Sequence, residues 1–283
     1  MRFIHADNLE DIALGAAVLG TGGGGDPYIG KLMAIQAIEA HGPVKLVDVD
    51  EVDDDSLVVP SAMMGAPTVM VEKVPKGDEI TRAFRALEEY LGRKIDYTMS
   101  IEAGGLNSTT PFTVAARLGI PLVDVDGMGR AFPEIQMVTA TLYGVPATPM
   151  AIADEKGNSA IINTPDNRWT ETLSRTITID MGCTAMIALY SLTGKQLKEA
   201  MVPGTITEAE KIGRTIREAR ATHRNPVEAV KEVTGGFEIF TGKIVDVQRR
   251  TERGFARGEA TFSGTDRYAS STLKLRFQNE HLV

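Results

Sequence analysis

Apolar residues in the first half of the chain alternate between helical and strand-like spacing. Helical spacing occurs in four segments, at 9–19, 28–38, 79–91 and 113–118. Short apolar runs that are typical of buried strands occur in four others, at 43–49, 56–60, 97–101 and 121–127. Because strands and helices take turns along the chain, we expect an α/β fold with a mostly parallel sheet.

The pattern changes after about residue 150. A hairpin pattern is followed by helical spacing in three segments, 166–177, 205–221 and 226–233. From Phe237 onward, apolar and polar residues alternate, which indicates an antiparallel β module. We therefore expect an α/β domain over residues 1–165 and a mixed α and antiparallel β domain over 166–283. The alternation still runs at 278–283, so we expect the second domain to be C-terminally incomplete.

The most unusual stretch is the glycine-rich loop at 20–27, which joins the first two predicted helices. Its run of glycines lets the backbone take positive φ angles and come close to a ligand. The N–H groups of such a loop can hold an anion, and the following helix adds its positive N-terminal end. The loop fits neither GxGxxG nor GK[ST], and a plain flexible turn is the alternative. The residues expected to bind a ligand are Gly22, Gly23, Gly24, Gly25 and Asp26.

Polar loops follow the predicted parallel strands at 65–67, 102–108 and 124–130. In open α/β sheets, ligands bind where such loops gather at the carboxyl ends of the strands. The candidate side chains in or just after the last two loops are Glu102, Asn107, Asp124, Asp126, Arg130 and Glu134. Because Asp124 and Asp126 alternate, we expect both on one side of a strand, where their charges repel. Either a divalent metal or Arg130 between them would relieve that repulsion.

Composition and charge narrow the classes of partner. The chain has 283 residues, of which 43% are hydrophobic and 24% charged, as in an ordinary globular protein. A net charge of −8 argues against nucleic acid or an anionic membrane as partner, which leaves a small-molecule substrate. The single cysteine, Cys183, lies in an apolar run, where we expect a buried hydrophobe. The low cysteine content and the N-terminal sequence, which lacks a signal-peptide pattern, together favour a cytoplasmic protein. A homo-oligomer is compatible with these features.

Seven motifs, in order along the chain, resemble those of one family. They are VLGTGGGGDPYIG, MMGAP, IEAGGLNS, DVDGMGRAFPE, ATPMAIADEKGN, DNRW and FQNE. Over essentially its whole length the chain is similar to the S-methyl thiohydantoin desulfurase family, formerly an uncharacterised family that accompanies hydantoin-utilisation genes. The resemblance implies an α/β N-terminal domain, a β-rich C-terminal domain and a hydrolase that replaces the S-methyl group of a five-membered cyclic ureide by oxygen. Family chains usually continue past FQNE into further β structure.

The implied reaction is attack of water on the C=N carbon of the ring. It needs a base for the water proton, donors for the developing charge and release of a thiolate. Carboxylates at the rim are the candidate bases, and those that we assign to catalysis are Glu102, Asp124 and Asp126. Substrate binding is assigned to the glycine-rich loop together with Asn107, Arg130 and Glu134. Asn279 and Glu280 could reach the cleft from the second domain.

Two other functions stay open on the sequence. One is a nucleotide- or phosphate-binding accessory subunit of a hydantoinase- or oxoprolinase-type system, which the glycine-rich loop alone would favour. The other is a non-catalytic assembly subunit, which predicts a stable co-purifying partner. The sequence does not identify a cofactor. The candidate that it suggests is a divalent metal bound by Asp124 and Asp126.

Overall fold

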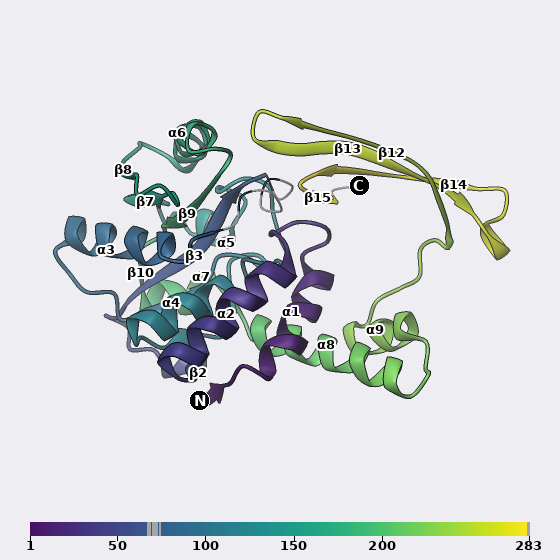
Figure 1. Ribbon diagram of the computed structural model, residues 1–283, viewed down its shortest axis with the longest axis horizontal. Helices are drawn as coiled ribbons and strands as arrows, with labels where there is room; N and C mark the ends of the chain where they lie inside the picture. Colours follow the sequence, from purple (N-terminus) through teal and green to yellow (C-terminus); the bar gives the residue numbers. More distant parts are fainter. Residues whose placement is uncertain (67–68, 70–72, 74, 282–283) are drawn as a thin grey trace.

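The structure, a computed structural model of the chain, describes residues 1–66, 69, 73 and 75–281. It has a large body built on one nine-stranded sheet and a thin C-terminal sheet that extends from it (Figure 1). The expected loop at 65–67 and the strand pattern at 278–283 fall partly outside the described residues. Within that part of the chain, none of the helices combines the length and apolar character that a membrane crossing needs.

The central sheet has parallel strands at its centre and antiparallel strands at its sides. The parallel strands are, in spatial order, β2 (Val44–Val47), β5 (Leu122–Val123), β4 (Tyr97–Ser100) and β3 (Leu57–Gly65). Antiparallel strands extend it with β1 (Arg2–Ile4) beside β2 and, beyond β3, β9 (Thr184–Ala188), β7 (Met150–Ala153) and β8 (Ser159–Ile162). The short β10 (Leu192–Thr193) also pairs with β3. The expected α/β class is confirmed.

Helices cover both faces of this sheet (Figure 1). One face carries α2 (Pro27–His41), α3 (Glu79–Leu91) and α4 (Thr110–Leu118). The other carries α5 (Thr139–Leu142), α6 (Asn167–Asp180) and α7 (Gly194–Ala200). At one side α1 (Asn8–Leu19) packs against α8 (Thr205–Ala221), so residues on either side of position 165 share the same body.

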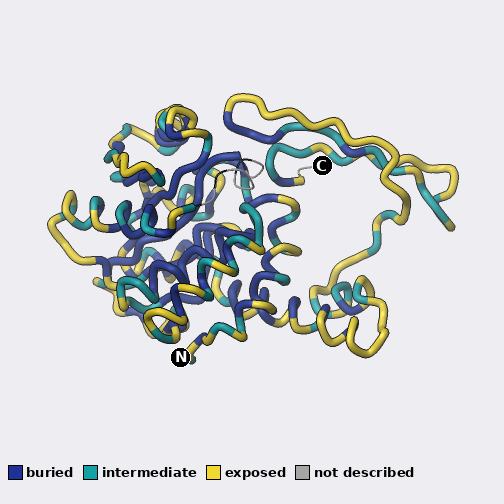
Figure 2. The backbone as a smooth tube through the Cα atoms, viewed as in Figure 1, coloured by how far each residue is buried: buried dark blue, intermediate teal, exposed yellow. Residues whose placement is uncertain are grey.

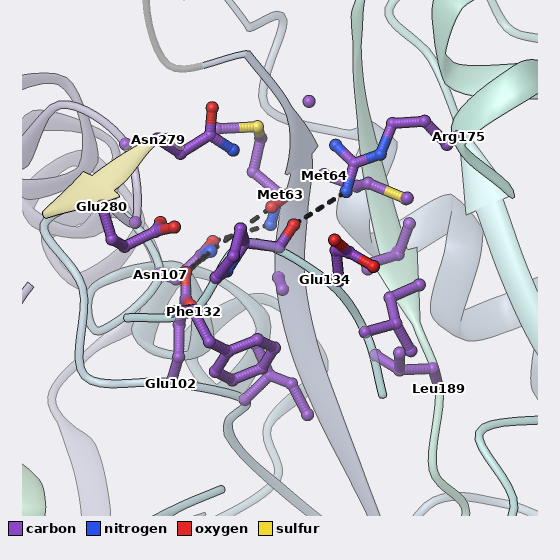
Figure 3. A pocket seen from close by; sticks show the side chains of 18 residues that line it. Met63, Met64, Glu102, Asn107, Phe132, Glu134, Arg175, Leu189, Asn279 and Glu280 are labelled. Carbon is purple, nitrogen blue, oxygen red and sulfur yellow. Dashed lines mark hydrogen bonds between the residues drawn. The ribbon is translucent and has the colours of Figure 1, made fainter. Parts of the chain in front are cut away.

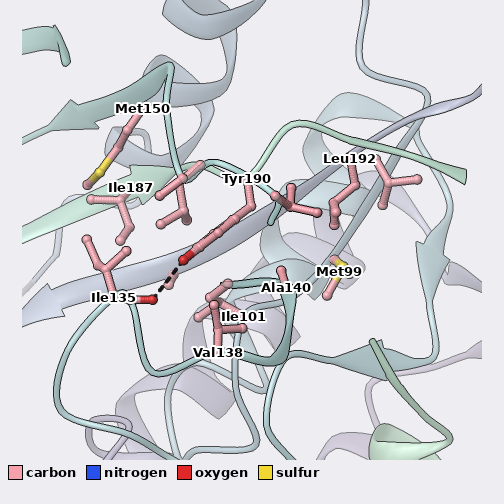
Figure 4. Close-up of a cluster of buried hydrophobic side chains, with 14 of the residues drawn as sticks. Met99, Ile101, Ile135, Val138, Ala140, Met150, Ile187, Tyr190 and Leu192 are labelled. Carbon is pink, nitrogen blue, oxygen red and sulfur yellow. Dashed lines mark hydrogen bonds between the residues drawn. The ribbon is translucent and has the colours of Figure 1, made fainter. Parts of the chain in front are cut away.

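Alternate side chains of β3 enter two different cores. Val58 and Met64 belong to one apolar cluster, whereas Val59 belongs to the cluster on the opposite face. Figure 4 shows the first cluster, in which the buried Tyr190 hydroxyl donates to the carbonyl of Ile135 at 3.0 Å. A strand that is covered on both faces needs a nearly continuous apolar run, which is what residues 57–65 provide.

The last part of the chain forms a second, four-stranded antiparallel sheet, which we call the C-terminal arm (residues 242–281). After α9 (Pro226–Thr234) its strands follow in the order β12 (Gly242–Glu252), β13 (Phe255–Gly264), β14 (Thr272–Gln278) and β15 (Glu280–His281). All eleven residues of β12 are exposed, whereas the start of β13 and Glu280 are buried (Figure 2). The arm therefore contacts the body mainly at one end. The small remaining elements are 3-10 turns at Val49–Glu51 and Asp266–Tyr268, and the pair β6 (Val125–Asp126) with β11 (Val202–Pro203).

Candidate active site

A cleft opens at the carboxyl ends of β3 and β4, beside the inner end of the arm (Figure 3). This is the edge of the sheet at which α/β proteins bind their ligands. The lining comes from residues far apart in the chain: Gly24, Gly25, 62–65, Ile101, Glu102, Asn107, 132–135, Arg175, Ile187, Leu189, Asn279 and Glu280. The body supplies most of this lining and the arm supplies the last two residues.

Glu102 follows β4 and is only 4% exposed. Its Oε1 accepts a hydrogen bond from Nδ2 of Asn107 at 2.6 Å, and its Oε2 accepts one from the backbone N–H of Phe132 at 2.9 Å. Burial raises the pKa of Glu102 and the nearby Glu280 raises it further, while the two donors lower it. A buried carboxyl with a raised pKa can exchange protons near neutral pH, which is the property that acid–base catalysis needs.

Glu280 brings a second carboxyl into the cleft from β15 of the arm. It is 2% exposed, and its Oε2 has no hydrogen-bond partner among the described residues. Burial raises the pKa of Glu280, whereas the Gly24 N–H and the charges of Arg130 and Arg175 lower it. A buried carboxyl oxygen without a partner is costly unless a ligand or a proton satisfies it. The expectation that Glu280 reaches the cleft thus agrees with the geometry, although the carboxyl was not among the residues assigned to catalysis.

Asn107 lines the cleft and orients Glu102. Its Oδ1 accepts from the Met63 N–H at 2.7 Å, and its Nδ2 donates to Glu102 at 2.6 Å and to the Met63 carbonyl at 3.3 Å. The side-chain amide therefore links the end of β3 to the loop after β4. Both polar groups of Asn107 make hydrogen bonds within the protein, and the substrate contact that we expected of it stays a prediction.

The concavity of the glycine-rich loop is filled by a side chain of the protein itself, the carboxyl group of Glu280. A Cβ atom on Gly23 would overlap the Glu280 carboxylate, and one on Gly22 would lie 2.6 Å from the His281 ring. Gly24 packs against Gly104, and a Cβ on Gly25 would lie 2.7 Å from Leu106. The missing side chains thus give room to the end of the arm and to the loop after β4.

The helix end beside this loop is also occupied. Asp26 precedes α2, and its Oδ1 accepts from the N–H groups of Tyr28 at 2.8 Å and Ile29 at 3.2 Å. The carboxylate is therefore the N-cap of α2 and compensates the positive helix end itself. Helix capping thus accounts for Asp26 within the protein, and its expected role in ligand binding stays a prediction.

Asp124 and Asp126, which we expected to act together, bind different backbone segments. Asp124 accepts from the Ile206 N–H at 2.8 Å and from the Thr207 hydroxyl, so it caps the N-terminus of α8 from outside that helix. Asp126 accepts from the N–H groups of Met128 and Gly129, at 2.9 and 2.6 Å. Among the described residues, the set that lines the cleft contains neither aspartate, and their assignment to catalysis stays a prediction.

Asp126 is nevertheless an unusual carboxyl. It is fully buried, and burial raises its pKa to about 7 against the two N–H donors, which lower it. We call the expectation of a divalent metal between Asp124 and Asp126 the shared-cation interpretation. It finds little support in this geometry, because the Asp124 oxygens cap α8. Across residues 1–66 and 75–281, His, Cys, Asp and Glu side chains form no group of three or more that could hold a metal ion.

Arg130 and Glu134, which we assigned to substrate binding, contact the arm. One guanidinium nitrogen of Arg130 donates to the Thr21 hydroxyl and to the His281 carbonyl, both at 2.8 Å. Glu134 lines the cleft, yet its Oε1 accepts from Nε2 of Gln278 at 3.1 Å. Both side chains therefore join the body to the last residues of the arm. The interpretation of Arg130 as a partner of Asp124 and Asp126 does not describe these contacts.

Arg175 is the cleft residue that the sequence interpretation missed. It is buried in α6, where its Nε donates to Glu171 at 2.7 Å and its terminal nitrogen donates to the Pro133 carbonyl at 3.0 Å. Its guanidinium also lies 4.1 Å from the ring centroid of Phe255 in the arm. The four-residue spacing of Glu171 and Arg175 on a predicted helix was the available signal for an ion pair, but nothing local placed it at the cleft.

Comparisons with known proteins agree with the motifs. Family models described as the N-terminal and C-terminal domains of S-Me-THD-like proteins match residues 7–164 and 165–283. A crystal structure of a protein from Chromobacterium violaceum is similar to the chain at 27% identity with a TM-score of 0.74. The matched region covers 100% of the present chain and 76% of the Chromobacterium violaceum chain. The comparison with curated proteins gives no match. The two family models together span almost all of the sequence, so the chain belongs to the S-Me-THD-like family.

Proposed function

We propose that the chain is a hydrolase that replaces the methylthio group of an S-methyl thiohydantoin-like ring by oxygen. The observation that carries the proposal is the pair of buried glutamates, Glu102 of the body and Glu280 of the arm, which line one cleft. The family supports a hydantoin-related substrate. A site with two carboxyls of raised pKa is suited to moving protons to and from such a ring.

The electrostatics favour one proton shared by the pair near neutral pH. Ionising both buried carboxyls costs free energy, because each carboxylate loses hydration and is repelled by the charge of the other. Glu102 accepts two hydrogen bonds, which orient its carboxylate for the role of base. Its pKa of about 8 lies above the value of about 7 for Glu280, so the form with the shared proton on Glu280 is the minor one, and we propose that this form is the reactive one. Glu280 has a buried Oε2 without a partner among the described residues, and a proton there would point at the substrate. The pair thus offers one base and one acid.

The proton transfers balance over one turnover. Water attacks the ring carbon that bears the methylthio group, Glu102 takes a proton from the water, and Glu280 protonates the adjacent ring nitrogen. The tetrahedral adduct then loses its hydroxyl proton to Glu280 as the C–S bond breaks. The departing methanethiolate takes the proton from Glu102. Water is consumed, methanethiol is released, and both glutamates return to their starting states.

The occupied anion sites argue against the accessory-subunit alternative. A phosphate group at the glycine-rich loop would meet the Glu280 carboxyl, and at the start of α2 it would meet Asp26. Both sites already hold a carboxyl of the chain itself. The hydrolase therefore has better support than a nucleotide- or phosphate-binding subunit.

The experiment is a turnover assay on S-methyl thiohydantoins with different groups at C5. Methanethiol is trapped with a thiol reagent, and the reaction is run in ¹⁸O-labelled water to follow oxygen into the ring carbonyl. Glu102→Gln and Glu280→Gln should each lower kcat/KM by about 10²–10⁴-fold, the usual contribution of a general acid or base. Glu228→Gln, at an exposed residue of α9, is the matched control and should act like the wild type.

A third variant tests the geometry of the pair. Gly23→Ala introduces a Cβ where the Glu280 carboxyl lies, so it should lower turnover to about the level of Glu280→Gln and leave the body folded. Lack of methanethiol release from the whole panel by folded wild-type protein would overturn the proposed function. Full activity in Glu102→Gln and Glu280→Gln would overturn the proposed roles.

A further inference from the structure

We infer that Arg130 is a positioning residue that holds β15 against the body and so sets the place of the Glu280 carboxyl in the cleft. The inference deepens the proposed function, because it depends on Glu280 acting there. The contact behind it is a three-way junction: one nitrogen of Arg130 bridges the Thr21 hydroxyl and the His281 carbonyl, both at 2.8 Å.

The junction holds β15 from the body side. The His281 N–H donates to the Thr21 carbonyl at 2.9 Å, so the strand end is bound through its N–H to Thr21 and through its carbonyl to Arg130. The Nε of Arg130 donates to the Ala131 carbonyl at 3.1 Å, which restrains the guanidinium itself. Glu280 directly precedes the residue that is bound in this way.

From the arm side, β15 pairs with β14, and a tight turn at Asn279 joins the two strands. Asn279 takes a left-handed backbone conformation with φ of 60°. Its N–H donates to the Ala256 carbonyl at 2.7 Å, and its Oδ1 accepts from the Ala256 N–H at 2.8 Å. These bonds join Asn279 to β13, but they place Glu280 only relative to the arm. Its place relative to Glu102 depends on the contacts with the body.

The arm needs such an anchor because it contacts the body over a small area. β12 is exposed along its whole length, and within the described residues β15 spans Glu280 and His281. Catalytic groups have to be held within a fraction of an ångström of the reacting atoms, and a misplacement of about 1 Å can cost about 10²-fold in rate. A guanidinium that binds both Thr21 and His281 has the fixed donor geometry for this task, whereas an ammonium does not.

The test uses Arg130→Met and Arg130→Lys, with Arg85→Met on the exposed face of α3 as the matched control. Hydrogen–deuterium exchange of the segment 277–281, without substrate, reports the docking of β15. Arg130→Met should raise that exchange and lower kcat by about 10–100-fold, Arg130→Lys should recover part of both, and Arg85→Met should change neither.

The decisive comparison places Arg130→Met in the Glu280→Gln background. If Arg130 acts through Glu280, the second substitution adds little to the loss of turnover. An equal loss in both backgrounds, or unchanged exchange at 277–281, would overturn the inference. Thr21→Val removes only the hydroxyl anchor and should shift exchange in the same direction, which guards against misfolding of the Arg130 variants. If the wild type shows no turnover, the proposed function fails, while the exchange measurements still decide whether Arg130 holds β15.

Discussion

The strands β3 and β12 are both long, yet they lie in opposite environments. All nine residues of β3 are buried between two helical layers, whereas all eleven residues of β12 are exposed (Figure 2). The body is therefore stabilised by apolar burial on both faces of its sheet. The arm is held by a few polar contacts, a cation–π contact and its own strand pairing. The comparison separates a part that carries stability from a part that brings a functional group to it.

The cleft lies where these two regions meet. The body supplies Glu102 on a loop that is fixed by Asn107, and the arm supplies Glu280 at its inner end. A substitution in the apolar core of the body, away from the cleft, should thus act mainly on the free energy of unfolding. One at the junction should act mainly on turnover.

The largest effect on stability is expected in the body. Phe84 of α3 is fully buried, and Phe84→Ala should lower the free energy of unfolding by about 3–5 kcal/mol through lost contacts and a cavity. Val247 of β12 is 54% exposed, and Val247→Ala should change the free energy of unfolding by less than about 0.5 kcal/mol. Urea unfolding of both variants checks the contrast. Comparable losses would mean that β12 is packed against something in solution.

A smaller effect is expected from the buried Asp126, and it depends on pH. Its folded pKa of about 7 lies above the ordinary value of 3.8, so the folded state keeps a proton that the unfolded state has released. This group therefore lowers the free energy of unfolding as pH rises from about 4 to 7, by up to about 4 kcal/mol. Asp126→Asn should remove that part of the slope. Unfolding of wild type and variant at several pH values provides the test, and parallel curves would contradict the assignment.

The smallest effect is expected at the cap of α8. Asp124→Ala removes the acceptor for Ile206 and Thr207 and should lower the free energy of unfolding by about 1–2 kcal/mol, with KM and kcat nearly unchanged. Thermal unfolding and steady-state kinetics measure the two quantities. A sharp loss of turnover that returns with added divalent metal would instead support the shared-cation interpretation.

The sequence predicts the elements well where burial alone decides them. The apolar run around Val58 and Val59 and the spacing around Phe84 define a buried strand and an amphipathic helix without knowledge of the fold. The motifs identify the family for the same reason, since they are long and local. The cleft was expected at the carboxyl ends of the parallel strands, and Glu102 was expected in it.

The roles of individual polar residues were harder to predict, because they depend on partners distant in sequence. Asp124 caps a helix that begins some eighty residues later, and Arg130 binds a strand at the far end of the chain. The alternation of Asp124 and Asp126 predicts that both carboxylates lie on one side of a strand. It does not predict which N–H groups donate hydrogen bonds to each of them. The same holds for Glu280, which fills the concavity of the glycine-rich loop.

The central claim is that Glu102 and Glu280 form one electrostatically coupled pair in the cleft. The direct measurement is a titration of the ¹³C-labelled glutamate carboxyl groups by NMR, in the wild type and in Glu280→Gln. Two carboxyls of the wild type should titrate well above the ordinary value of 4.5, and the pKa of Glu102 should fall when the Glu280 charge is removed. If Glu102 titrates near the ordinary value in the wild type, or at the same pH in both proteins, the account of the site is wrong.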